Sequence, residues 1–364
     1  MWGMPNPPQR PNAKPLLSML DLVSVREGGT VAQALNITVR TAQHAEALGF
    51  QRYWLAEHHN MASVASSATA VLVGHVAGAT STIRVGSGGI MLPNHAPLVV
   101  AEAFGTLAEL YPGRIDLGLG RAPGTDGYTM QALRRDRHES EEDFPRDVAE
   151  LQQLLDDPQP GQRIIAMPGA GTKVPIWLLG SSLFSARLAA QRGLPFAFAS
   201  HFAPRYLLAA LEVYRSEFKP SAALKAPYVA VGVPLIAAPT DAEAELLASS
   251  SYQRVLGIIT GKRGRLAPPV PNFLDKLHPQ EREAVQSFLA AAVVGGPSTV
   301  LQGLAHIHKL TQADEMVLVS DIFEVDLRLR SLTIAAHALK DLHAQLAHAD
   351  EQPELAEALV HSPN

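Results

Sequence analysis

Two consecutive histidines, His58 and His59, are the side chains best suited to proton transfer near neutral pH. The pair lacks the helical spacing of two zinc ligands, and no third ligand is obvious, so we expect no metal site. On an extended segment the two rings point to opposite sides, so one of them could face a catalytic site. The alternative is that both histidines are structural.

A second group of residues could bind an anion. Gly180, Ser181 and Ser182 lie between an apolar run and the first turn of a predicted helix. Backbone N–H groups and hydroxyls at a helix start, with the positive end of the helix dipole, favour phosphate. Arg121 follows another apolar run and carries a planar guanidinium that suits phosphate oxygens. The alternatives are that Ser182 only caps its helix and that Arg121 pairs with a carboxylate.

Gly88 and Gly89 interrupt an otherwise apolar segment that is predicted to be a strand. Glycine weakens a strand, so its presence indicates either a bulge or the close approach of a flat ligand. The sequence leaves both interpretations open.

The elements that carry these residues alternate along the chain. Short apolar runs, typical of strands buried on both faces, alternate with segments of helical periodicity. Capping boxes at Thr30 with Gln33 and at Thr240 with Glu243 indicate two helix starts. The predicted strands are residues 16–20, 51–56, 83–91, 114–119, 174–179, 195–199, 228–237 and 316–319.

Eight strands, each followed by a helix, favour an α/β fold, a (β/α)8 TIM barrel with insertions after strands four and seven. A doubly wound open sheet is the main alternative. In a barrel the active site is built after the carboxyl ends of the strands. The residues singled out above fall at such ends, as do Asp21, Ser200-His201-Phe202 and Ser320-Asp321.

The composition narrows the classes of function. The chain has 364 residues, a net charge of −5 and no cysteine, which excludes disulfides, thiolate metal sites and cysteine nucleophiles. The charge gives no reason to expect nucleic acid or a membrane as partner, and no apolar stretch is long enough to span a bilayer. We expect a cytoplasmic protein with a flexible lead (1–15), one barrel domain (16–346) and a flexible tail (347–364).

Four motifs, in order, give the chain a specific family resemblance. They are YWLAEHHN (53–60), VGSGGIMLP (85–93), GRIDLGLGRAPG (113–124) and WLLGSS (177–182). The chain resembles the bacterial luciferase-like flavin monooxygenases over about residues 16–345. The resemblance implies a barrel enzyme, often dimeric, that uses FMN or a deazaflavin.

The resemblance also implies functions for individual residues. His58 matches the family histidine that lies over the flavin and transfers a proton. Gly88 and Gly89 match a pair whose non-prolyl cis peptide bond lies against the isoalloxazine ring. Arg121 and the Gly180-Ser181-Ser182 turn match the phosphate contacts. Gly120, which we assign to the same cofactor site, stands where the true luciferases carry a reactive cysteine, so light emission from a long-chain aldehyde is not expected.

The resemblance implies a monooxygenase that uses reduced FMN and O₂ to oxygenate a small organic substrate through a flavin C4a-hydroperoxide. A separate NAD(P)H:flavin reductase would supply the reduced flavin. We expect a homodimer packed through the helices predicted at 69–80 and 97–110, which carry more apolar residues than one inner face needs. The charged segment 133–144 could close over the site or simply be a solvated loop. The alternative functions are a deazaflavin (F420)-dependent oxidoreductase and a non-catalytic flavin-binding protein.

Overall fold

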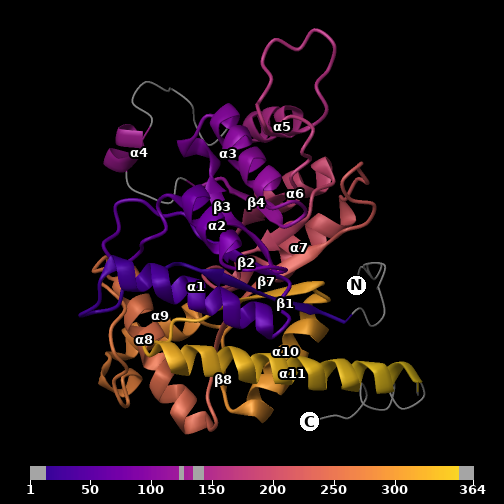
Figure 1. The fold of residues 1–364 in the computed structure, drawn as a ribbon. Coiled ribbons are helices and arrows are strands. Elements are labelled where there is room, and N and C mark those ends of the chain that lie inside the picture. The colour runs from indigo at the N-terminus through magenta and orange to yellow at the C-terminus, as the bar shows by residue number, and fades with distance from the viewer. Residues whose placement is uncertain (1–13, 123–126, 134–142, 352–364) are drawn as a thin grey trace.

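The computed structural model describes residues 14–122, 127–133 and 143–351, and their strands form a closed parallel barrel surrounded by helices (Figure 1). The barrel closes because β6 pairs with β7, β7 with β9, and β9 with β1. Its eight strands are β1 (Leu16–Asp21), β2 (Arg52–Leu55), β3 (Arg84–Met91), β4 (Ile115–Gly120), β5 (Ile176–Gly180), β6 (Phe196–Phe198), β7 (Val229–Ala237) and β9 (Glu315–Val319).

The helices that follow the strands cover the outside of this barrel. The last of them lies beside the first, where His44 is hydrogen-bonded to Thr333 (Figure 1). They are α1 (Val31–Ala47), α2 (Thr69–Gly78), α3 (Pro97–Leu110), α4 (Gly127–Leu133), α5 (Phe144–Leu155), α6 (Leu183–Arg192), α7 (Leu207–Ser216), α8 (Asp241–Ile259), α9 (Pro279–Phe288), α10 (Pro297–Thr311) and α11 (Val325–Glu351). None of the described helices is both long and apolar enough to cross a membrane.

The predicted (β/α)8 barrel is confirmed, and its closure excludes the open sheet. The two insertions are present, with α4 and α5 after β4, and α8, α9 and α10 after β7. The second insertion also contains a short strand that the sequence did not predict, β8 (Val293–Gly295), which pairs with the end of β7. Its three residues are too few to show a periodic pattern.

Two helix ends differ from the sequence prediction. The capping box of Thr30 and Gln33 is present in full. Thr240 accepts a hydrogen bond from the backbone N–H of Glu243, but the Glu243 carboxylate pairs with Arg330 instead of completing a second box. Helix α11 continues to Glu351, so residues 347–351 of the expected tail belong to this helix.

Two layers of side chains fill the inside of the barrel. The layer near the carboxyl ends is apolar and includes Trp54 and Trp177, whose ring centroids are 5.0 Å apart. The layer near the amino ends is ionic: Arg52 on β2 lies 2.8 Å from both Glu315 on β9 and Asp116 on β4. Both carboxylates are fully buried, and Asp116 also pairs with Arg84, so each buried acid has an arginine partner inside the barrel. The amino end of the barrel is therefore packed, and space for a ligand lies at the carboxyl end.

Candidate active site

A cavity of about 330 Å³ lies at the carboxyl ends of the strands, and we call it the central cavity. Its wall comes from β1 to β7 and β9 and from the loops that follow them. All eight residues that the sequence predicted for the site line it: His58, Gly88, Gly89, Gly120, Arg121, Gly180, Ser181 and Ser182. Residues 123–126, which follow the Arg121 motif in the sequence, and most of the candidate lid at 133–144 lie outside the described residues.

Gly88 and Gly89 bring bare backbone to the wall of this cavity. The peptide bond between them is cis, as the family resemblance implies, and the register between β3 and β4 shifts here. A Cβ atom on Gly88 would lie 2.7 Å from the Leu20 side chain, and one on Gly89 would lie 2.6 Å from the Gly118 carbonyl oxygen. The register shift confirms the bulge, and the pair also lines the cavity; the close approach of a flat ligand stays a prediction.

The segment after β2 turns its two histidines in opposite directions. His58 lines the central cavity. Nε2 of His59 lies 2.8 Å from Oε1 of the buried Glu57, and Nε2 of His95 lies at the same distance from that oxygen. Burial alone would raise the pKa of Glu57, but the hydrogen bonds from His95 and His59 and from the Met91 N–H hold it below its usual value. This ionised, fully engaged carboxylate fixes the segment that presents His58.

The same three side chains correct one expectation about metals. The sequence offered no obvious third ligand near the two histidines, yet the possible ligand atoms of Glu57, His59 and His95 lie within 4.8 Å of one another. His95 follows β3, far from Glu57 in the sequence, and the barrel brings the two side chains together. The contacts of 2.8 Å are hydrogen bonds, and we interpret the trio as a support for His58.

The wall of the central cavity also carries the groups predicted to bind an anion. Ser182 occupies the N-cap position of α6, but its side chain makes no capping hydrogen bond. Ser182 therefore does not cap α6 through its side chain. Both Ser181 and Ser182 line the cavity. The guanidinium of Arg121 lies 4.6 Å from the ring centroid of Phe184, in the first turn of the same helix. Hydroxyls, helix N–H groups and a guanidinium thus converge on one place.

His201 is a cavity residue to which the sequence assigned no function. It follows β6, and its ring packs so closely on β7 that a side chain at Gly232 would clash with it. Burial, reinforced by the charges of Arg254 and His58, lowers the pKa of His201 to about 4. Its buried Nδ1 has no hydrogen-bond partner among the described residues. The position after a strand was the available signal, but the sequence could not show how close the ring lies to β7.

Asp21, in contrast, does not face the cavity. Its carboxylate accepts hydrogen bonds from Arg328 on α11, at 3.0 Å, and from Thr38 on α1, at 2.7 Å. Although burial opposes ionisation, the charge of Arg328 and the hydrogen bonds of Tyr53 and Thr38 lower the pKa of Asp21. Asp21 therefore attaches two helices to the barrel.

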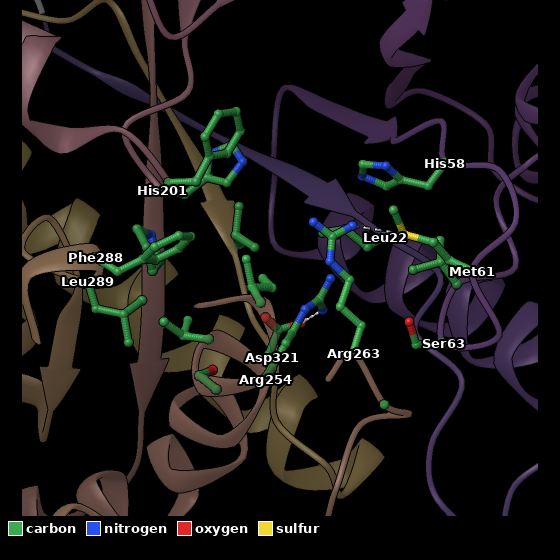
Figure 2. Close-up of a pocket in the computed structure, with 18 residues that line it drawn as sticks. Leu22, His58, Met61, Ser63, His201, Arg254, Arg263, Phe288, Leu289 and Asp321 are labelled. Carbon is green, nitrogen blue, oxygen red and sulfur yellow. Dashed lines mark hydrogen bonds and ion pairs between the residues drawn. The ribbon is translucent and has the colours of Figure 1, made fainter. Parts of the chain in front are cut away.

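A second cavity, of about 380 Å³, adjoins the first, and we call it the side cavity (Figure 2). Its wall includes α8, the segment after α8, and the ends of β7 and β9. Four residues belong to the walls of both cavities: Leu22, His58, His201 and Phe202. A molecule in the side cavity would therefore share its walls with one in the central cavity.

Comparison with known sequences gives one consistent family. The model of the luciferase-like monooxygenase family matches residues 17–313. A luciferase-like monooxygenase of Escherichia coli (strain K12) is 50% identical over 325 residues, which cover 89% of this chain and 97% of the relative.

Solved structures agree with the fold. The structure described as apo-MsnO8 is 34% identical, with a TM-score of 0.80, and the match covers 89% of this chain and 98% of that one. The oxygenating constituent of 3,6-diketocamphane monooxygenase from Pseudomonas putida, a type II Baeyer–Villiger monooxygenase in complex with FMN, has a TM-score of 0.66 at 17% identity, covering 89% and 97% of the two chains. An F420-dependent secondary alcohol dehydrogenase has a TM-score of 0.67 at 14% identity, covering 90% and 99%. The last two similarities concern the fold alone.

Proposed function

The chain belongs to the luciferase-like monooxygenase family, and on this premise we propose that it is an FMN-dependent monooxygenase of a small organic substrate. Reduced FMN would supply the two electrons with which one atom of O₂ enters the substrate and the other leaves as water. The residues of the chain would bind the flavin, orient it, keep water away and move a proton. The observation that carries the proposal is that one cavity gathers all eight predicted site residues.

The central cavity fits both ends of FMN. The bare backbone of Gly88 and Gly89 offers a surface that a flat ring system can approach, because no side chain fits there. In the same cavity wall, Ser181, Ser182 and Arg121 offer hydroxyl and guanidinium donors to a phosphate. The ring and the phosphate of one molecule would then both lie in this cavity.

His58 is the residue that we assign to catalysis. Its imidazole lines both cavities, so it can reach a flavin in one and a substrate in the other. An imidazole there could donate a proton to the reacting oxygen. Glu57, held by His59 and His95, keeps the segment in place while His58 acts.

Reducing power would come from a separate NAD(P)H:flavin reductase. NAD(P)H is available in the cytoplasm, and we propose that the protein is located there. Reduced FMN would then be a co-substrate that is exchanged in each turnover.

Binding is the first test, and it requires no substrate. The purified protein is titrated with FMN, riboflavin and F420, followed by absorbance and fluorescence. Arg121→Ala should weaken FMN binding by about 1.5–3 kcal/mol, the value of a charged hydrogen bond, and leave riboflavin binding unchanged. Arg187→Ala is the matched control, because Arg187 lies on α6 but pairs with Glu217 at 3.1 Å and does not line the cavity.

The possible outcomes of these titrations support different functions. Equal losses for FMN and riboflavin would mean that Arg121 does not hold the phosphate. Binding of F420 without FMN would favour the deazaflavin-dependent oxidoreductase. Reduced FMN and isotopically labelled O₂ are then supplied with a panel of aldehydes, ketones and thioethers, and mass spectrometry looks for one labelled oxygen in the product. FMN binding without transfer to any compound would favour a flavin-binding protein.

A further inference from the structure

The side cavity combines an apolar wall with charged groups. Helix α8 turns one face toward it, because Ser251, Arg254, Val255 and Ile258 follow helical spacing. Phe288 and Leu289, at the end of α9, lie on another side of the cavity (Figure 2). These side chains form a surface for the apolar part of a ligand.

The two arginines of this cavity differ in their partners. Nη1 of Arg254 lies 2.6 Å from the carboxylate of Asp321 and 3.1 Å from the Ser24 hydroxyl. Its charge is therefore compensated within the wall. Arg263 has no carboxylate partner among the described residues, and its guanidinium donates a long hydrogen bond to the Met61 sulfur, at 3.9 Å. In Figure 2 this guanidinium lies between the His58 side and the Phe288 side of the cavity. Arg263 thus gives the cavity an unbalanced positive charge.

The segment that carries Arg263 is held in place by backbone contacts. Leu266, three residues later, exchanges backbone hydrogen bonds with the loop after β1: its N–H donates to Val25 and its carbonyl accepts from Glu27. On the other side, the carbonyl of Lys262 packs on Gly257 of α8, where a Cβ atom would lie only 2.9 Å away. Arg263 is therefore presented from a fixed backbone, although its side chain is exposed.

We propose that the side cavity binds the organic substrate and selects an anion, a carboxylate attached to an apolar body, whose carboxylate pairs with Arg263. The apolar body would lie against Val255, Ile258 and Phe288. The assignment as substrate site rests on the proposed function, whereas the preference for an anion follows from the charges of the cavity. A guanidinium suits a carboxylate because it offers two parallel N–H donors.

The flavin phosphate is the other anion that could reach an arginine here. Arg121 and the serines of the α6 start lie in the central cavity, and Arg263 lines only the side cavity. We therefore assign the phosphate to Arg121 and the substrate carboxylate to Arg263. The experiment below keeps the two assignments separate.

Calorimetric binding of a matched pair of probes tests the proposal. The probes are 4-phenylbutanoate and its neutral amide, 4-phenylbutanamide, which differ in charge and hardly in shape. Wild-type protein should bind the acid at least about 10-fold more tightly than the amide, since a charged hydrogen bond contributes about 10- to 100-fold. Arg263→Gln should remove this preference by weakening the acid alone, and Arg263→Lys should retain part of it.

The control is Lys262→Gln, which removes the same charge from the neighbouring exposed residue that does not line the cavity. It should behave as wild type. Equal affinity of wild type for acid and amide, or an equal loss in Lys262→Gln, would overturn the proposal. A loss of FMN affinity in Arg263→Gln as large as its loss for the acid would assign Arg263 to the phosphate.

A parallel FMN titration keeps this inference separate from the proposed function. If wild type fails to bind FMN, the proposed function fails, and the comparison of acid and amide still decides the charge preference. If FMN binds but the two probes bind alike, only the inference fails.

Discussion

His58 and His59 are adjacent in the chain but have different surroundings, and this difference can be measured. His58 lines both cavities, whereas His59 is hydrogen-bonded to Glu57. If His58 transfers a proton, His58→Gln should bind FMN almost normally and lose about 10²- to 10⁴-fold in turnover, the usual contribution of a general acid or base. Single-turnover oxidation of reduced FMN, followed by stopped-flow absorbance with an accepted substrate, measures this loss.

His59→Gln is the matched control for this experiment. Glutamine can still donate a hydrogen bond to Glu57, so turnover should change little. Oxygenation at the wild-type rate by His58→Gln would make this histidine structural. A larger loss in His59→Gln than in His58→Gln would exchange the two assignments.

His201 should stay neutral at pH values where an ordinary histidine is charged. Its pKa is lowered to about 4 in the folded protein, while in the unfolded chain it is about 6.5. Between these two values the unfolded state binds more protons, so this histidine reduces the free energy of unfolding as the pH falls from about 6.5 to 4. Titration of its imidazole by NMR should give a midpoint near 4.

A stability comparison checks the same point independently. The free energy of unfolding, measured in urea, should fall more between about pH 7 and pH 5 for wild type than for His201→Asn. The asparagine side chain cannot gain a proton in this range. An NMR midpoint near 6.5, or identical pH dependence in the two proteins, would show that burial does not hold His201 neutral.

Among the elements, the barrel strands were the most predictable part of the molecule. A strand buried on both faces, such as β7, appears in the sequence as a largely apolar run, and all eight barrel strands were predicted from such runs, although glycines interrupt β3 and β4. The predicted site followed, because a barrel brings the carboxyl ends of its strands together. Gly88, Arg121 and Ser182 are distant in sequence and line one cavity for this reason.

The side cavity could not be predicted in the same way. Its wall depends on how α8 and the segment that carries Arg263 fold back over the barrel end. Local patterns give the existence of α8 but not the direction in which it lies. The contact between His95 and Glu57 was missed for the same reason, since it depends on the relative placement of two loops.

The ionic layer should make Arg52 one of the costliest residues to replace. Arg52→Met would leave Glu315 without its arginine and Asp116 with one arginine fewer, inside the barrel and away from water. Breaking a buried pair from one side costs about 3–5 kcal/mol, so the free energy of unfolding should fall by that amount in urea.

Arg40→Ala is the control for the ionic layer. It removes an arginine that also pairs with a carboxylate, Asp326, but at the exposed surface, and its effect should stay within about 0.5 kcal/mol. Equal effects of the two substitutions would mean that water reaches the inside of the barrel.

At the scale of the whole molecule, two neighbouring helices carry apolar side chains that the monomer leaves exposed. Val71 on α2 is 71% exposed, and Val99 and Leu110 on α3 are 58% and 64% exposed. We expect these helices to pack against a second copy of the chain, giving a homodimer. Light scattering at micromolar concentration should give twice the mass of the chain, and Val71→Glu with Val99→Glu should halve it.

Leu310→Glu serves as control for the dimer, because Leu310 is exposed on α10, outside the expected interface. This variant should remain dimeric. A monomeric mass for the wild-type protein would contradict the expected dimer. Dissociation caused by Leu310→Glu alone would show that the interface lies at α10.

The wall that the two cavities share makes their occupancies interdependent. A ligand that fills the central cavity would restrict the shared wall, above all the exposed ring of Phe202, and the second ligand would then meet side chains that have already lost freedom. We therefore expect positive cooperativity between flavin and organic acid without any movement of the barrel. Thermodynamic linkage makes this effect reciprocal. The factor by which FMN raises the affinity for 4-phenylbutanoate must equal the factor by which 4-phenylbutanoate raises the affinity for FMN. Affinities that are independent of each other would mean that the shared side chains are equally ordered in the empty protein.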